Sequence, residues 1–178
     1  SLFYSSAAHA CVRMMLPELA CRLYVKLWKI MPDRLENALH VISLAHNLKN
    51  YTLRDEILEE VINKMKNDEI KISNLWGFSN RMRTLNLNDK YKDVMTCIID
   101  KSSGRKRLSA ISTLMDYYMG NNNEQAIQDL INTHFTEKEL NLEESFALLQ
   151  IYTRFGEQEK LKPIINNVMQ QLTNNTLI

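Results

Sequence analysis

Side chains that could do chemistry are present, but none occurs at a catalytic spacing. The sequence has no phosphate-binding loop, no Gly-x-Gly-x-x-Gly, no His-Glu-x-x-His and no Gly-x-Ser-x-Gly. His9 and Cys11 are two residues apart on an expected helix, so they do not share the face that a common metal ion needs. His40 and His46 lie six apart and do not converge. We therefore expect no catalytic centre, no metal site, no cofactor and no enzymatic activity.

Cationic, amide and aromatic residues recur late in the first helix of each expected helical hairpin. This ladder consists of Arg13, Asn47, Lys49, Asn80, Arg81, Arg83, Tyr117 and Arg154. Cations neutralise phosphates, aromatic rings stack on bases and amides read base edges, so the pattern predicts a groove for single-stranded RNA. A solvated helix face is the competing interpretation, because Arg and Asn are common surface residues.

A basic segment follows the third hairpin. It runs from Lys101 to Arg107, reads KSSGRKR, and is expected to be a polar connector whose glycine ends a helix. It adds four candidate contacts to the RNA backbone: Lys101, Arg105, Lys106 and Arg107. An exposed connector without a ligand is the competing interpretation.

The elements that must position these residues belong to a repeat. The stretch 36–101 contains one unit twice, and an offset of 36 residues brings the apolar positions into register. The aligned pairs are Leu39 with Leu75, Ile42 with Phe78, Leu58 with Val94, Val61 with Cys97 and Ile62 with Ile98. Self-similarity at this period is typical of stacked helical hairpins.

The repeat predicts an all-α fold, a right-handed α-solenoid of about five antiparallel hairpins and about ten helices. The expected repeats are 1–32, 33–68, 69–104, 105–136 and 137–172, within one domain of residues 1–178. Each hairpin is too small to bury both of its faces, so each must lean on its neighbours around a concave inner face. The chain begins at Ser1 with a helical pattern, and we expect a piece of a longer array or a processed chain.

Local signals place the helix ends. Pro17 suits a first helical turn, and capping residues are expected at Asp33 with Glu36, Thr52, Asn121 with Glu124, and Asn141 with Glu144. Gly120 and Gly156 are expected in left-handed conformations at equivalent helix ends. The helix after Pro17 is expected to bury Leu19, Leu23, Leu27 and Ile30.

Composition narrows the class of protein. The formal net charge of +1 gives no bulk signature of polyanion binding. Cys11, Cys21 and Cys97 have no paired spacing, which indicates thiols in a reducing compartment. No apolar run approaches the roughly 18 residues of a membrane span, so no membrane insertion is expected.

Two segments carry a resemblance to a known family. They are ISNLWGFSNRMRTLNLNDKYKDVMTCIIDK from Ile72 and ALHVISLAHNLKNYTLRDEILEEVINKMK from Ala38. Both resemble the octotricopeptide and heptatricopeptide repeats of FAST kinase-like proteins, with pentatricopeptide repeats as close relatives. The run from Ile72 to Ser79 is similar to the family's first-helix pattern. The resemblance implies organellar RNA work, in transcript processing, in translation, or as a structural part of a mitochondrial ribosome.

Two functions stay open on the sequence alone. The first is a non-catalytic mitochondrial protein that binds single-stranded RNA or rRNA, together with other proteins of a ribonucleoprotein assembly. The second is a protein-binding scaffold of a large complex without RNA contact, which the near-neutral net charge favours.

Overall fold

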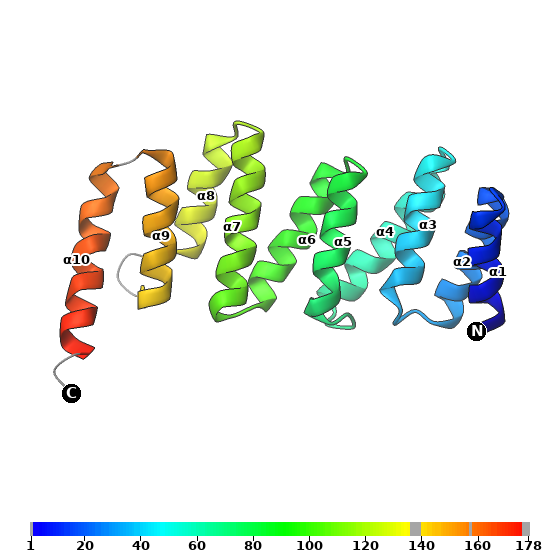
Figure 1. Ribbon diagram of the computed structural model, residues 1–178, viewed down its shortest axis with the longest axis horizontal. Coiled ribbons are helices and arrows are strands. Elements are labelled where there is room, and N and C mark those ends of the chain that lie inside the picture. The colour runs from blue at the N-terminus through cyan, green and yellow to red at the C-terminus, as the bar shows by residue number, and fades with distance from the viewer. Residues whose placement is uncertain (1, 136–139, 157, 176–178) are drawn as a thin grey trace. The chain divides into compact units, whose positions relative to one another are not determined.

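Helices form almost all of the described chain. A computed structural model describes residues 2–135, 140–156 and 158–175, and these residues contain no β-strand (Figure 1). The ten α-helices are α1 (Leu2–Arg13), α2 (Pro17–Ile30), α3 (Leu35–Asn47), α4 (Tyr51–Lys66), α5 (Ile72–Thr84), α6 (Asn88–Lys101), α7 (Gly104–Gly120), α8 (Glu124–His134), α9 (Leu142–Phe155) and α10 (Gln158–Asn175). The predicted all-α fold with ten helices is confirmed. The expected start of the fifth repeat, at residue 137, lies outside the described residues.

The chain divides into two compact units. Unit 1 is Ser1–Ile98 and unit 2 is Ile99–Ile178, so the last turn of α6 belongs to unit 2.

Unit 1 stacks its hairpins in two layers. Helices α1, α3 and α5 lie side by side in one layer, in front of α2, α4 and α6 in Figure 1. In the first layer the rings of His9 and His40 join α1 to α3, with centroids 5.8 Å apart. In the second layer Trp28 Nε1 of α2 donates to a carboxylate oxygen of Glu60 on α4 at 2.6 Å. Each hairpin therefore contacts the next through both of its helices.

Unit 2 follows the same plan with two hairpins. Helix α7 packs against α8, α9 packs against α10, and α7 also packs against α9. Lys160 Nζ of α10 donates to Gln128 Oε1 of α8 at 3.4 Å, which joins the second helices. Buried aliphatic side chains fill the space between these helices: Leu114, Ile127, Ile131, Leu148, Ile164 and Val168.

Every turn inside a hairpin contains one residue in the left-handed conformation. These residues are Met15, Lys49, Asn86, Asn122 and Gly156, with φ between 53° and 70°. In the first four turns the following amide donates to a carbonyl five residues back: Leu16 to Cys11, Asn50 to Ala45, Leu87 to Met82 and Asn123 to Tyr118, at 2.8–3.0 Å. This is the Schellman arrangement, which satisfies the last free carbonyls of the helix. The same turn thus closes the helical hairpins of both units.

The left-handed residues correct the repeat register. From Lys49 to Asn86 the offset is 37 residues, one more than the aligned sequence copies imply. Burial agrees with 37: Ala38 and Leu75 are both buried, whereas Leu39 and Trp76 are both half-buried. The aligned pairs of the sequence copies are therefore wrong by one residue. The buried equivalents are Val41 with Phe78, Ile57 with Val94, Leu58 with Met95, Val61 with Ile98 and Ile62 with Ile99.

Several predicted helix caps are also wrong. Helix α3 begins after Arg34 without a side-chain cap, so Asp33 and Glu36 form no capping box. Asn50, and not Thr52, caps α4 by accepting from the Leu53 amide at 3.2 Å. Likewise Asn123, and not Asn121, caps α8. The reason is geometric, because in both turns the cap is the residue directly after the left-handed one.

Three terminal signals behave as predicted and one does not. Asn141 and Glu144 form the predicted capping box on α9, and Pro17 occupies the first turn of α2. Gly156 is left-handed as predicted, with φ of 70°. Gly120 instead ends α7 in a helical conformation, and Asn122 takes the left-handed position.

The buried face of α2 differs from the predicted stripe. Leu27 is buried and Leu23 half-buried, but Leu19 and Ile30 are exposed. Tyr24 and Trp28 take their place in the core. Helix α2 is apolar on several sides, so spacing alone does not select a face.

Candidate nucleic-acid interface

Six predicted RNA contacts come together at one edge of unit 1. Arg13 and Asn47 are the last residues of α1 and α3, and Lys49 is the left-handed residue of the next turn. Asn80, Arg81 and Arg83 lie near the end of α5. All six side chains are exposed. We call these six residues the cationic edge.

Neighbouring first helices set the spacing of the cationic edge. Helix α3 packs against α5, and the His9–His40 contact places α1 beside α3. Packed helix axes lie about 8–10 Å apart, so the three helix ends extend over roughly 20 Å. In unit 1 the predicted residues therefore follow one another along neighbouring helix ends and turns.

The positive charges of the cationic edge are not compensated within the described part of the fold. Among the described residues, Arg13, Lys49, Arg81 and Arg83 form no ion pair with a carboxylate. Cations at a helix C-terminus are favoured by the helix dipole, which explains their placement without any ligand. Four unpaired cations on adjacent helix ends can also neutralise the phosphates of a nucleic-acid backbone.

Rings near the cationic edge were not predicted as part of the site. His40 stacks on Tyr24 with centroids 4.3 Å apart, and His9 meets both rings edge to face at 5.8 Å. Burial lowers the pKa of His40, and the charges of His9 and Arg81 lower it further, against the opposing effect of Glu36. The lowered pKa favours the neutral form of the His40 ring at pH 7. The sequence carried no signal for this cluster, because His9 and His40 belong to different repeats.

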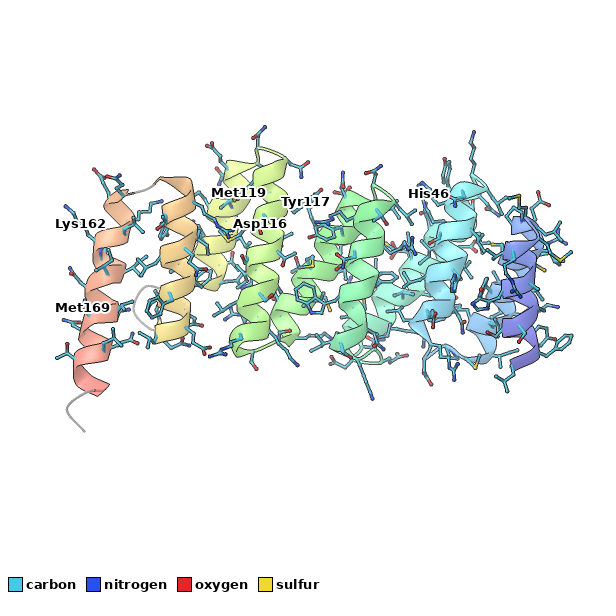
Figure 2. The ribbon with its side chains drawn as sticks, viewed as in Figure 1. His46, Asp116, Tyr117, Met119, Lys162 and Met169 are labelled. Carbon is cyan, nitrogen blue, oxygen red and sulfur yellow. The ribbon has the colours of Figure 1, made fainter. Side chains whose placement is uncertain are left out.

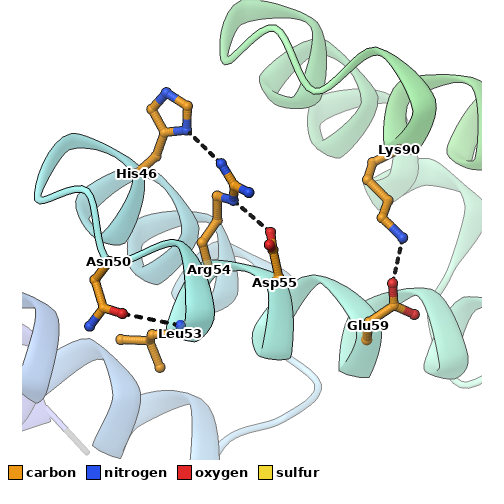
Figure 3. Close-up of polar contacts among 7 residues, drawn as sticks. All are labelled: His46, Asn50, Leu53, Arg54, Asp55, Glu59 and Lys90. Atoms are coloured by element: carbon orange, nitrogen blue, oxygen red, sulfur yellow. Dashed lines mark hydrogen bonds and ion pairs between the residues drawn. The ribbon is translucent and has the colours of Figure 1, made fainter.

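A second group of rings lies at the tip of the second hairpin. Figure 3 shows His46 Nδ1 accepting from Arg54 Nη1 at 3.3 Å, while Arg54 Nε donates to Asp55 at 2.7 Å. The exposed ring of Tyr51 lies 4.7 Å from the Arg54 guanidinium and 6.0 Å from the His46 ring. Tyr51 follows Lys49 by two residues, so an aromatic residue next to a basic turn was the available signal. Exposed aromatic rings of this kind stack on unpaired bases.

The predicted contacts in unit 2 are arranged differently. Arg154 of α9 pairs with Asp116 of α7 at 2.9 Å, and Figure 2 shows Asp116 beside Tyr117 near the end of α7. Tyr117 is half-buried and packs against Tyr118 with ring centroids 5.7 Å apart. Arg154 thus joins two helices of the stack, and its charge is compensated.

The basic segment is not a connector. Helix α6 continues through Lys101 and α7 begins at Gly104, so Arg105, Lys106 and Arg107 form the first turn of α7. The glycine therefore starts a helix and does not end one. Lys106 is exposed and Lys101 is half-buried. Along α7 this turn lies 10 to 12 residues before Tyr117, which is about 15–18 Å at 1.5 Å per residue, so the two predicted groups lie near opposite ends of the helix.

The arginines of this turn make contacts within the fold. Arg105 Nε lies 3.0 Å from Glu143, and Arg107 lies 3.8 Å from Glu144. Arg107 also donates to His134 Nδ1 at 3.2 Å. Burial lowers the pKa of His134, and the Arg107 charge lowers it further. These contacts tie α7 to α8 and α9, which accounts for the arginines without a ligand.

The second-helix layer of unit 1 contains a cavity that the sequence did not predict. Its volume is about 650 Å³, and α2 contributes Glu18, Arg22, Lys26 and Lys29 around an apolar floor that includes Leu53. The cavity is a second cationic surface in the same unit. It therefore supplies the natural control for experiments on the cationic edge.

The two units differ in net charge. Residues 1–98 contain 14 Lys and Arg against 11 Asp and Glu, a net of +3, whereas residues 99–178 contain 8 against 10, a net of −2. Attraction to a polyanion is therefore expected at unit 1.

The described residues offer neither a metal site nor a membrane span. No cluster of three His, Cys, Asp or Glu side chains in the described part of the chain could hold a metal ion. In the same residues no helix combines the length and the apolar character needed to cross a bilayer.

Comparison with known proteins adds no relative. No protein-family model, no curated protein and no solved structure matches the chain.

Proposed function

We propose that the protein is a non-catalytic helical-hairpin repeat protein that binds single-stranded RNA through the cationic edge of unit 1. The observation that carries the proposal is the set of four cations on adjacent helix ends, Arg13, Lys49, Arg81 and Arg83, without carboxylate partners among the described residues. Phosphates would bind these cations, and Asn47 and Asn80 would face the base edges. The sequence resemblance to octotricopeptide and heptatricopeptide repeats supports an organellar ribonucleoprotein, in a mitochondrion, as the setting.

The experiment compares two charge reversals in the same unit. Binding of a fluorescently labelled, unstructured RNA is measured by anisotropy for the wild-type protein and for Arg81→Glu/Arg83→Glu. Arg22→Glu/Lys29→Glu changes the net charge by the same amount, but on the cavity side of α2. The edge variant should lose at least about tenfold in affinity, while the α2 variant stays close to wild type.

Salt dependence gives a second readout. Four phosphate contacts predict that log Kd rises with log salt with a slope of about 3, and removing two of them lowers the slope to about 1.4. Equal losses in both variants would mean that only the overall charge matters. A folded wild-type protein without salt-sensitive RNA binding would refute the proposal.

A protein-binding scaffold is the second candidate function, and unit 2 favours it. Arg105, Arg107 and Arg154 are compensated within the fold, and the net charge of this unit is −2. We infer that RNA contact is confined to unit 1. A partner that stays bound to unit 2 after nuclease treatment supports the scaffold, and loss of every partner under nuclease rejects it.

A further inference from the structure

The cavity of about 650 Å³ in unit 1 lies between the first two hairpins. One wall is the face of α2 from Glu18 to Lys29, and the other is the turn from α3 into α4 with the first turn of α4. Trp28 Nε1 donates to Glu60 at 2.6 Å, and this hydrogen bond holds α2 against α4. Volumes of roughly 300–1,000 Å³ are typical of sites for small organic ligands, so the cavity has the size of such a site.

The floor of the cavity is apolar. Cys21 and Val25 of α2 line it, together with Leu48 and Leu53 from the other wall. Cys21 is 5% exposed, and because burial raises the pKa of its thiol, the side chain is neutral at pH 7. Val25, Leu48 and Leu53 are half-buried. An alkyl chain that lay on these three side chains would remove their remaining apolar surface from water.

Three uncompensated cations surround this floor. Arg22, Lys26 and Lys29 follow one another along α2 at spacings of four and three residues, and all three are exposed. In the described part of the chain none of them forms an ion pair with a carboxylate. Glu18 contributes the only carboxylate of the described lining residues, and it lies about 16 Å along the helix from Lys29. Lys26 Nζ lies 6.0 Å from the centre of the Tyr4 ring, a contact that adds no negative charge.

The helix dipoles account for only part of this charge. Lys29 lies in the last turn of α2, where a cation is favoured, but Arg22 lies in the middle of the helix. Across the cavity α4 begins after Asn50, whose side chain accepts from the Leu53 amide at 3.2 Å (Figure 3). The first turn of α4 contains no acidic residue, so the partial positive charge of this helix end adds to that of the cations. An anion is therefore the charge complement of the cavity.

We propose that the cavity binds a small organic anion with an apolar body, of the class of fatty carboxylates. The alkyl chain lies on Val25, Leu48 and Leu53, and the carboxylate binds the cations of α2, where the Arg22 guanidinium offers paired N–H donors. A hydrocarbon would cover the floor only, and inorganic phosphate would bind the cations only. A fatty carboxylate satisfies both. The proposal is independent of RNA binding.

The test measures binding of cis-parinarate, a fatty carboxylate whose fluorescence rises when its chain leaves water. Octanoate, decanoate and octanol then compete with it on the wild-type protein. The two extra methylenes of decanoate should lower its competing concentration about tenfold relative to octanoate. Octanol has the chain length of octanoate without the charge, and it should require a concentration at least about tenfold higher. This series needs no variant.

Three variants separate the cations, the floor and the overall charge. Arg22→Glu/Lys29→Glu should weaken cis-parinarate binding at least about tenfold. Val25→Trp fills the cavity and keeps the cations, and it should abolish binding. Arg81→Glu/Arg83→Glu changes the net charge by the same amount at the cationic edge, and it should bind cis-parinarate like wild type. Far-ultraviolet circular dichroism checks that each variant is folded.

Several results would overturn the proposal. They are a folded wild-type protein that does not bind cis-parinarate, equal competition by octanoate and octanol, binding that survives Val25→Trp, and equal losses in the two charge-reversal variants. Capture of an acidic amphipathic peptide in place of cis-parinarate would assign the cavity to a protein segment and would also overturn it. Displacement of cis-parinarate by unstructured RNA, with RNA affinity unchanged in the cationic-edge variant, would assign the cavity to RNA and overturn both proposals.

Discussion

Replacing Gly156 by alanine tests the turn that closes the hairpins. Gly156 has φ of 70°, and a Cβ built there meets no atom within 4 Å, so the substitution adds no steric clash. Left-handed backbone costs an L-residue about 1–2 kcal/mol, while alanine lowers the entropy of the unfolded chain by about 0.4–1 kcal/mol relative to glycine. The net expectation is a loss of about 1 kcal/mol in the free energy of unfolding.

Gly120→Ala is the matched control in the same unit. Its Cβ also meets no atom within 4 Å, but its φ lies outside the left-handed region. Alanine is favoured over glycine in a helix by about 0.5–1 kcal/mol, so this variant should be more stable than wild type, by less at a helix end. The two substitutions are chemically identical and should have opposite signs.

The assay is urea and thermal unfolding followed by far-ultraviolet circular dichroism. The fluorescence of Trp28 and Trp76 follows unit 1, because both tryptophans of the chain lie there. For an 80-residue unit, 1 kcal/mol corresponds to a shift in Tm of about 4–8 °C. Equal destabilisation by both variants would place Gly120 in a left-handed turn, as the sequence suggested, and would refute the assignment to Asn122. A neutral Gly156→Ala would refute the strain argument itself.

Two further predictions concern contacts between helices and the histidines. Glu60→Ala should cost about 1.5–3 kcal/mol because it leaves the buried Trp28 N–H without its charged acceptor, whereas Glu59→Ala breaks an exposed ion pair and should cost less than about 1 kcal/mol. Equal costs in urea unfolding would contradict this account. His40 and His134 have folded-state pKa values below the usual 6.5, so the unfolded chain binds more protons, and stability should fall as pH drops below about 6.5. Replacing both by glutamine should flatten the pH dependence of the urea midpoint between about pH 5 and 7, and an unchanged slope would contradict the assignment.

Most of the fold could be predicted because hydrophobic periodicity survives in every helix. The exact register could not, because successive turns are spaced unevenly. At two of these turns the left-handed residues are Met15 and Lys49, and neither methionine nor lysine indicates that conformation in a sequence. A constant offset of 36 therefore placed Leu39 where the structure buries Ala38. Turn geometry, which the sequence encodes weakly, decided the register.

Only part of the candidate site could be predicted, and the physical reason differs from that for the register. Residue type and helix position sufficed to place Arg13 and Arg83 at exposed helix ends. They did not suffice for Arg105, Arg107 and Arg154, whose acidic or histidine partners lie 27 to 38 residues away. A contact over that distance depends on how hairpins stack, so only the structure shows which cations are compensated.

The most direct test of the central claim is to map where RNA touches the protein. A short unstructured RNA containing 4-thiouridine is crosslinked by ultraviolet light to the full chain, and the adducts are located by mass spectrometry. We predict adducts in the peptides of the cationic edge and its rings, which contain His9, His40, Tyr51 and Arg81. Adducts confined to α2 or to unit 2, or none with a folded protein, would contradict the assignment of RNA binding to this edge.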